Sequence, residues 1–327
     1  MSERVLILGA NGRLGRTLVA AFAGAGWTVL AQARRPLDFS VEGRLKSNVH
    51  TILTGVDATD RLAAEIRGAD VVVHAMNANY SRWVTDALPL AQSAIDIAKR
   101  LEATLLFPGN VYNFGSPMPA VLCEDAPHRP TTRKGLIRVQ TESRLRDQAA
   151  SGLRSIVIRA GDFYGGTGAG SWMDLVIAKD LAKGKIVYPG PLHLPHAWAY
   201  LPDLARAFVA VAHERKRCAP FETLHFAGNT LTGQQMVEAL SQAARRAGLL
   251  PLTRSPVVGK LPWWAMRAGA WAVPMWRELL EMRYLWEEAH ALDESRLAKR
   301  VGQVPRTPLD EAMDRSLADL GFGGAEG

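Results

Sequence analysis

Three glycines near the N-terminus have the spacing of a phosphate-binding turn. Gly9, Gly12 and Gly15 follow the apolar run "RVLIL" and open a segment of helical period. Glycines at such positions let the backbone turn tightly and approach a pyrophosphate, which the N–H groups at a helix N-terminus then bind. We therefore predict that this turn binds a dinucleotide. The predicted cofactor contacts in the turn are Gly9, Asn11, Gly12, Arg13, Leu14 and Gly15.

The next charged residues indicate which dinucleotide is bound. Arg34 and Arg35 follow the second apolar run in "AQARRP", and no acidic residue occurs before Asp38. A carboxylate there would hold the ribose 2′-hydroxyl, whereas a guanidinium pairs with a 2′-phosphate. The sequence therefore predicts that NADP(H) is preferred over NAD(H), unless both arginines are only solvated surface charges. Asp57, in "GVDATD", is placed to accept a hydrogen bond from the adenine amino group.

Short apolar runs alternate with segments of helical period along the first half of the chain. The expected strands are "RVLILGA", "TVLAQAR", "VHTILTGVD", "DVVVHAM", "TLLFPG" and "SIVIRAG". Strands that are apolar on both faces and separated by helices predict an α/β fold with a doubly wound parallel, Rossmann-type sheet. Residues 1–162, with 197–228 returning to them, should form this dinucleotide-binding domain. Residues 163–196 and 229–327 should form a smaller, mainly helical substrate or interaction lobe.

These motifs resemble the short-chain dehydrogenase/reductase superfamily, specifically its extended branch of nucleotide-sugar epimerases and dehydratases. "GANGRLG" resembles the glycine motif of that branch, "HAMNANY" the loop that lines the nicotinamide channel, and "GNVYNFG" and "RAGDFYGG" two later loops of its substrate crevice. The resemblance ends near residue 215. It implies cofactor contacts from Ala75, Met76 and Asn77. The substrate contacts expected in the crevice are Asn79, Tyr80, Asn110, Tyr112, Tyr164 and Trp198.

The chain departs from this family where the family keeps its catalytic groups. The family uses a Ser or Thr hydroxyl, a proton-transferring Tyr and a Lys four residues after that Tyr. At the matching positions this chain has Pro108, Lys134 and Arg138, and none of its six tyrosines is followed by Lys four residues later. The resemblance therefore implies an atypical member that lacks the Tyr-x-x-x-Lys motif, in which Pro108, Lys134 and Arg138 border the cofactor.

Lys134 and Arg138 have the spacing of two residues on one helix face. Arginine is always charged, so Arg138 is suited to hold ribose hydroxyls or a phosphate. Lys134, partly desolvated beside another cation, would exchange its proton more readily and could protonate an alkoxide as a hydride arrives. The alternative is that both residues only anchor ribose and a substrate anion. Tyr80 is a second candidate donor, so the predicted catalytic residues are Lys134, Arg138 and Tyr80.

Composition narrows the expected partners. Lys and Arg number 39 and Asp and Glu 32, a net charge of +7, but the cations are scattered and no basic-aromatic module occurs, so we expect no nucleic-acid partner. Cys123 and Cys218 stand alone and the N-terminus does not resemble a signal peptide, which favours a cytoplasmic protein.

The spacing of His193 and His196 could suit two ligands of a metal ion. A proline lies between them, however, and no carboxylate is near in sequence, so we expect no metal.

Residues 261–286 hold five of the nine tryptophans, and charged residues interrupt the segment. It should therefore not span a membrane. We expect a protein-facing surface there, either the roof of a substrate crevice or the contact of a possible homodimer.

The leading functional hypothesis is an NADP(H)-dependent oxidoreductase with a non-standard proton donor, which acts on a carbonyl or sugar-like small molecule between the lobes. One alternative is a non-catalytic NADP-binding redox sensor or scaffold protein, which the missing catalytic groups favour. Another keeps the cofactor for internally redox-neutral chemistry, as in epimerases.

Overall fold

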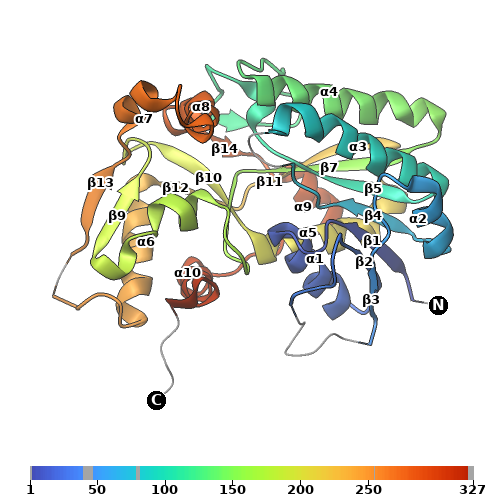
Figure 1. The fold of residues 1–327 in the computed structure, drawn as a ribbon, viewed down its shortest axis with the longest axis horizontal. Helices are drawn as coiled ribbons and strands as arrows, with labels where there is room; N and C mark the ends of the chain where they lie inside the picture. The colour runs from blue at the N-terminus through green and yellow to red at the C-terminus, as the bar shows by residue number, and fades with distance from the viewer. Residues whose placement is uncertain (1, 40–46, 79–81, 254, 323–327) are drawn as a thin grey trace.

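A computed structural model describes residues 2–39, 47–78, 82–253 and 255–322. Its main element is a seven-stranded sheet in the order β11-β7-β5-β4-β1-β2-β3, in which every neighbouring pair is parallel (Figure 1). The strands are β1 (Arg4–Leu8), β2 (Thr28–Gln32), β3 (Val49–Ile52), β4 (Val71–His74), β5 (Thr104–Gly109), β7 (Arg154–Ala160) and β11 (Phe221–Phe226). The predicted doubly wound, Rossmann-type sheet is confirmed.

Helices cover both faces of this sheet. One face carries α1 (Arg13–Gly24), α5 (Leu201–Glu214) and α9 (Ser295–Val301), and the other carries α2 (Thr59–Ile66), α3 (Trp83–Arg100) and α4 (Arg133–Gln148). Side chains alternate along β1, so Val5 and Ile7 pack with α1 and α5 while Leu6 and Leu8 pack with α2 and α3. Burial on both faces explains why these strands are apolar throughout.

A second lobe lies beyond the carboxyl ends of the main strands, at the left of Figure 1. It contains two small sheets as well as helices. The first sheet joins β12 (Asn229–Thr232), β10 (Pro195–Tyr200) and β8 (Asp162–Tyr164), and the second joins β13 (Val257–Lys260) to β9 (Lys185–Tyr188). The helices are α6 (Gly233–Arg246), α7 (Trp263–Gly269), α8 (Pro274–Glu281) and α10 (Leu309–Leu317). A short pair of strands, β6 (Val121–Leu122) and β14 (Ala291–Leu292), joins distant parts of the chain.

The second lobe has its own core of aromatic side chains. Tyr164, Trp198 and Trp286 are fully or almost fully buried in it, together with Met236 of α6 and Met313 of α10. The strand that the sequence does not predict in this lobe is β13, where Val257–Lys260 pairs with Lys185–Tyr188 across a long sequence separation. Pairing of that kind leaves no local sequence signal.

Candidate functional site

The turn between β1 and α1 can be built only with glycine at two of its three positions. Gly9 has a φ of +87°, and a Cβ there would lie 3.0 Å from the carbonyl oxygen of Ala75 and from the backbone of Met76. A Cβ on Gly15 would lie 2.2 Å from the carbonyl oxygen of Gly9. The turn therefore packs directly against the loop after β4, at the carboxyl end of the sheet.

Gly12 is less constrained by the chain, because a Cβ there would lie 3.2 Å from the carbonyl oxygen of Gly9. It is exposed, its φ is an ordinary −72°, and it precedes a helix that has no side-chain cap. The first N–H groups of a helix have no partner within the helix. A small exposed residue in front of such groups is the arrangement that lets a phosphate approach the backbone, so the turn fits a dinucleotide.

Other residues of the turn connect it to neighbouring loops. The Nε and Nη2 atoms of Arg13 donate hydrogen bonds to the carbonyl oxygen of Gly165 at 3.1 and 2.9 Å, and Nη1 pairs with Asp174 at 2.9 Å. Asn11 donates through Nδ2 to the carbonyl oxygens of Arg35 and Pro36. Leu14 packs against the core of the main sheet. Arg13 thus ties the turn to the second lobe, and Asn11 ties it to the loop after β2.

The end of β2 presents the two cations that the sequence singles out. Arg34 and Arg35 are both exposed. The guanidinium of Arg35 pairs with Asp38 at 3.0 Å, and Arg16 pairs with the other oxygen of Asp38 at 2.5 Å. The side chain of Arg34 makes no hydrogen bond or ion pair within the described part of the chain. Asp57 is exposed beyond the end of β3, just before α2.

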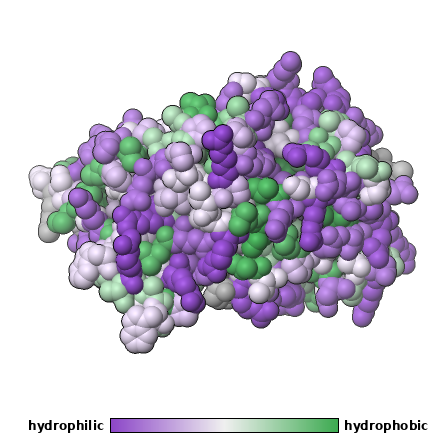
Figure 2. Space-filling view, turned by 90° about the horizontal axis from the view of Figure 1, so that it is seen from above, coloured by the Kyte–Doolittle hydropathy of each residue, from purple (hydrophilic) through white to green (hydrophobic). Residues whose placement is uncertain are grey.

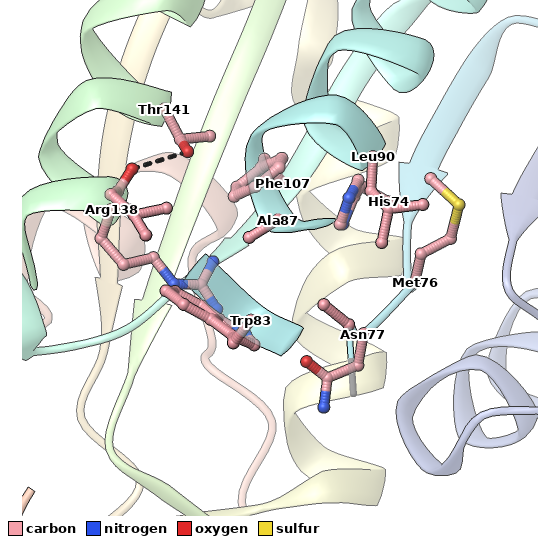
Figure 3. Close-up of a pocket in the computed structure, with 11 residues that line it drawn as sticks. His74, Met76, Asn77, Trp83, Ala87, Leu90, Phe107, Arg138 and Thr141 are labelled. Atoms are coloured by element: carbon pink, nitrogen blue, oxygen red, sulfur yellow. Dashed lines mark hydrogen bonds between the residues drawn. The ribbon is translucent and has the colours of Figure 1, made fainter. Parts of the chain in front are cut away.

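Arg138 reaches from α4 to the end of β5, where its Nη1 atom donates a hydrogen bond of 3.1 Å to the carbonyl oxygen of Pro108. The guanidinium lies over the rings of Trp83 and Phe107, at 5.0 and 5.9 Å from their centroids. Figure 3 shows this side chain beside Trp83, on the side of the sheet that carries α3 and α4. The Nε atom of Arg138 is buried, and the two aromatic rings hold the guanidinium in one position. A cation that is fixed in this way is suited to bind a ligand.

A cavity of about 20 Å³, large enough for one water molecule, lies beside Arg138. Figure 3 shows His74, Met76 and Asn77 around it. Neither ring nitrogen of His74 has a hydrogen-bond partner among the described residues. Burial, and next the charge of Arg138, lower the pKa of His74 to about 3, so the ring is neutral at physiological pH.

Lys134 lies in surroundings that the sequence does not predict. Its side chain is 1% exposed, and its Nζ atom forms ion pairs with Glu278 and, at 3.4 Å, with Glu281, both on α8 of the second lobe. Arg133 pairs with the same two carboxylates at 3.1 and 2.7 Å. Burial raises the pKa of Glu281, but the hydrogen bond from Arg133 and the charge of Lys134 outweigh burial and hold that pKa below its ordinary value. Two carboxylates of α8 therefore tie the second lobe to the first turn of α4.

Two sets of polar side chains follow β5 and β7, one around Tyr112 and one around Asp162. The backbone N–H of Tyr112 donates to the side chain of Asn110 at 3.1 Å. Asp162, at the start of β8, pairs with the Nε2 atom of His196 at 2.8 Å, and the His196 ring stacks on Trp286 at 4.5 Å. Burial and then the charge of Asp162 raise the pKa of Tyr112, and the charge of Arg138 opposes them only partly. Tyr112 is thus a hydroxyl that keeps its proton at neutral pH.

The remaining predicted residues divide into two sets. Tyr164 and Trp198 are fully buried in the aromatic core of the second lobe, where the Tyr164 hydroxyl accepts a hydrogen bond from Asn229 at 2.7 Å. Asn79 and Tyr80 lie outside the described residues.

Among the residues that the structure does describe, no group of three His, Cys, Asp or Glu side chains could hold a metal ion. No helix in the same part of the chain is long and apolar enough to cross a bilayer.

Sequence reasoning missed several residues of this region. Glu278 and Glu281 come from a lobe without recognisable motifs, and no local pattern links them to Lys134. Asp162 lies inside "RAGDFYGG", a segment that the resemblance marks as a crevice loop, so a search for acids in that segment would have found it. His196 stands out in sequence only as half of a weak metal pattern, whereas its partner in the structure is Asp162.

Comparison with known proteins gives the fold a family. The sequence profile of the NAD dependent epimerase/dehydratase family matches residues 5–223. No curated protein sequence matches the chain. Among solved structures, the UDP-Glc/GlcNAc 4-epimerase of Campylobacter jejuni aligns with a TM-score of 0.75 at 14% identity, over 97% of this chain and 99% of that one.

Two further structures are similar over their whole length. The UDP-glucose 4-epimerase of Thermotoga maritima, solved with UDP-glucose, aligns with a TM-score of 0.74 at 14% identity, over 97% of this chain and 98% of that one. The Bordetella bronchiseptica enzyme WbmH, solved in complex with NAD+, aligns with a TM-score of 0.73 at 16% identity, over 98% of both chains. At such identities the likeness concerns the fold, while the profile match covers more than half of the chain and includes the glycine turn. The chain belongs to the NAD dependent epimerase/dehydratase family.

Proposed function

We propose that this protein is an NADP(H)-dependent oxidoreductase or epimerase-like enzyme that acts on a carbonyl or sugar-like small molecule. The observation that carries the proposal is the turn around Gly12, where close packing at Gly9 and Gly15 leaves an exposed helix N-terminus. Family membership supports it, and so do the names of the similar structures, which include UDP-glucose as a ligand. A nucleotide sugar is accordingly the first substrate class to test.

The cofactor would be held by the residues around this turn. The N–H groups at the start of α1 would bind the pyrophosphate, Asp57 the adenine, and the loop of Ala75, Met76 and Asn77 would flank the nicotinamide. Arg138 would hold the nicotinamide ribose beside Pro108. When bound, the nicotinamide supplies or accepts a hydride.

Preference for NADP(H) rests on the charges at the end of β2. A carboxylate there would repel a 2′-phosphate, but Asp38 already pairs with Arg16 and Arg35. Arg34 has no such partner within the described residues, and its exposed guanidinium is available to a phosphate. WbmH was solved with NAD+, so the phosphate preference is a property that we propose for this chain alone.

A carbonyl that receives a hydride also needs a proton at its oxygen. Lys134 is our proposed source, because it occupies the position of the family's tyrosine and its ammonium group carries the proton. Glu278 and Glu281 would orient that ammonium and stabilise its charge until the proton leaves. Tyr112 is the alternative source, since it follows β5 next to Asn110 and its hydroxyl stays protonated because burial raises its pKa. The two sources are separable by substitution.

The burial of Lys134 also supports a second candidate function. An ammonium that is 1% exposed and paired with two carboxylates is well suited to fasten the two lobes together. Pro108 has no hydroxyl to offer a substrate, and its carbonyl oxygen is occupied by Arg138. A non-catalytic NADP-binding redox sensor or scaffold protein would keep the cofactor site and use Lys134 in this way.

One experiment separates the two functions. Purified protein is titrated with NADPH and NADH by calorimetry, and then incubated with NADPH and a panel of nucleotide sugars, ketones and aldehydes while absorbance of the reduced nicotinamide is followed. Redox-neutral epimerisation is followed by chromatography of the nucleotide sugars. Turnover of any substrate supports the enzyme. Tight NADPH binding without turnover across the panel would favour the sensor or scaffold, and absence of binding would exclude both.

A further inference from the structure

The helical hairpin of α7 and α8 and the strand before it form a surface that the fold does not use. We call the exposed side chains of residues 257–277 the outer face. Its most exposed apolar side chains are Trp264 at 79% and Trp271 at 88%, and Val257, Val258 and Met275 are also exposed. Figure 2 looks onto the side of the molecule that carries α7 and α8, where pale and green side chains lie among purple ones at the left. Large apolar side chains gathered on one surface mark an interaction site.

The inward side chains of the same hairpin account for its packing without help from the outer face. The Nε1 atom of Trp263 donates to the carbonyl oxygen of Pro189 at 2.7 Å, and Met266 is buried. The ring of Trp276 lies so close to Gly269 that a Cβ there would be 2.4 Å from it. Trp264 and Trp271 therefore contribute little to folding, which leaves their exposure to be explained by a partner.

The charges around these tryptophans have a single sign. No Asp or Glu occurs between Glu238 and Glu278 in the sequence. Lys260, Arg267 and Arg277 are exposed, and their side chains form no ion pair with another described residue. The acids that follow, Glu278 and Glu281, point inward to Arg133 and Lys134. The outer face is thus apolar and cationic at once.

From this combination we infer that the outer face docks on an anionic lipid surface. Tryptophan is enriched at the boundary between lipid and water, and exposed valine and methionine side chains can enter the acyl region while Lys and Arg contact the headgroups. The cations are attracted to acidic headgroups, each worth about a fivefold gain in binding. Such docking is peripheral and reversible.

A second copy of the chain fits this surface less well. In a two-fold dimer the same patch meets itself, so Lys260, Arg267 and Arg277 would oppose cations of their own kind without a neutralising acid. A nucleic acid would satisfy the charges but not the aliphatic side chains of Val257 and Val258. The lipid surface satisfies both kinds of side chain.

The test is co-sedimentation of the whole protein with vesicles of phosphatidylcholine, with and without 30 mol% phosphatidylglycerol. We expect binding to the anionic vesicles that is roughly a hundredfold stronger than to the neutral ones, from three cations at about fivefold each. The double variant Trp264→Ala/Trp271→Ala should weaken binding by roughly tenfold or more, since both rings leave the interface. Lys260→Gln/Arg267→Gln should reduce the preference for phosphatidylglycerol to roughly fivefold, because only Arg277 of the three cations remains.

Matched controls change residues of the same kind elsewhere. Leu53→Ala removes an exposed apolar side chain near β3, and Arg217→Gln removes an exposed cation that pairs with Glu214. Both should bind vesicles like the wild type, and all variants should keep the wild-type Tm. Equal binding by the tryptophan variant and the wild type, or no wild-type binding, would overturn the proposal. It would also be overturned if sedimentation velocity without vesicles showed a dimer that the tryptophan variant loses, because the outer face would then be a self-contact.

Discussion

The guanidinium of Arg138 donates a hydrogen bond of 3.1 Å to the carbonyl oxygen of Pro108. These two residues occupy the positions where the family resemblance places the ribose-holding lysine and the hydroxyl donor. Their contact joins the end of β5 to α4 and leaves the remaining donors of the guanidinium next to the loop after β4. The contact therefore fixes a cation at the end of β5, beside a proline that has no side-chain hydroxyl.

Arg138→Met should therefore weaken NADPH binding more than it slows turnover. The substitution keeps most of the apolar length over Trp83 but removes a permanent charge and its hydrogen bonds. Loss of a hydrogen bond to a charged group costs about 1.5–3 kcal/mol, or roughly ten- to a hundredfold in affinity. Calorimetric titration measures it, with Arg146→Met on the same helix as the control. Unchanged affinity in a folded Arg138→Met protein would remove Arg138 from the cofactor site.

Gly12→Val should abolish cofactor binding and leave the fold intact. The backbone at Gly12 has an ordinary φ of −72°, and a Cβ would only crowd the carbonyl oxygen of Gly9 at 3.2 Å. A side chain there would instead occupy the space through which a pyrophosphate approaches. Gly24→Ala, where a Cβ meets nothing within 4 Å, is the control in the same helix. If Gly12→Val bound NADPH like the wild type, the dinucleotide assignment itself would fail.

Arg34→Ala should lower the affinity for NADPH by roughly ten- to a hundredfold and leave the affinity for NADH unchanged. The reason is that only NADPH carries the 2′-phosphate. Arg34 is exposed at the end of β2 and, unlike Arg35, does not pair with Asp38. Arg217→Ala, an exposed arginine far from β2, is the control for net charge. Equal affinity of the wild-type protein for both cofactors would contradict the assignment.

The main sheet and the glycine turn were predictable because their signals are local. Each strand is a short apolar run, and Gly9, Gly12 and Gly15 lie within seven residues of one another. The partners of Lys134 were not predictable, since Glu278 and Glu281 are more than 140 residues away in sequence and come together with Lys134 only when the second lobe folds back on α4. For the same reason β13 escaped detection, because its pairing with β9 connects two segments that have no common pattern.

His225 should make the stability of the protein fall in mild acid. Arg159 donates to its Nε2 atom at 3.1 Å, so the proton of the neutral ring must be on Nδ1, which lies 3.1 Å from the carbonyl oxygen of Leu122. Burial and then the charge of Arg159 lower the pKa of His225 to about 3. Between about pH 6.5 and pH 3 the unfolded chain thus binds a proton at this residue that the folded chain does not, and the free energy of unfolding decreases as the pH falls through this range.

The measurement for His225 is the slope of the unfolding free energy against pH between pH 4 and pH 6.5. One such histidine contributes up to about 1.4 kcal/mol per pH unit. His225→Gln should flatten the slope by about that amount, whatever it does to the overall stability. His193→Gln replaces an exposed histidine and should leave the slope unchanged. A slope that is the same in His225→Gln and the wild type would show that this residue titrates alike in both states.

Lys134 has two proposed roles, proton donor and tie between the lobes, and a pair of substitutions distinguishes them. Lys134→Met leaves the buried carboxylate of Glu278 without its closest cation, which should cost about 3–5 kcal/mol of folding free energy. The second substitution, Glu278→Gln, removes that unpaired charge, so Lys134→Met/Glu278→Gln should regain most of the lost stability. Thermal unfolding measures this part, and Glu287→Gln, an exposed acid paired with Arg283, is the control.

Turnover of an identified substrate then decides between the roles. If Lys134 supplies the proton, the stabilised double variant stays slow although it binds NADPH like the wild type, because a methionine has no proton to give. If Lys134 only ties α4 to α8, the double variant recovers turnover together with stability. In that case Tyr112→Phe should be the slow variant, since its hydroxyl is the other protonated group beside Arg138. Near-normal turnover in both the double variant and Tyr112→Phe would exclude both donors, and Tyr80→Phe would be the next substitution to make.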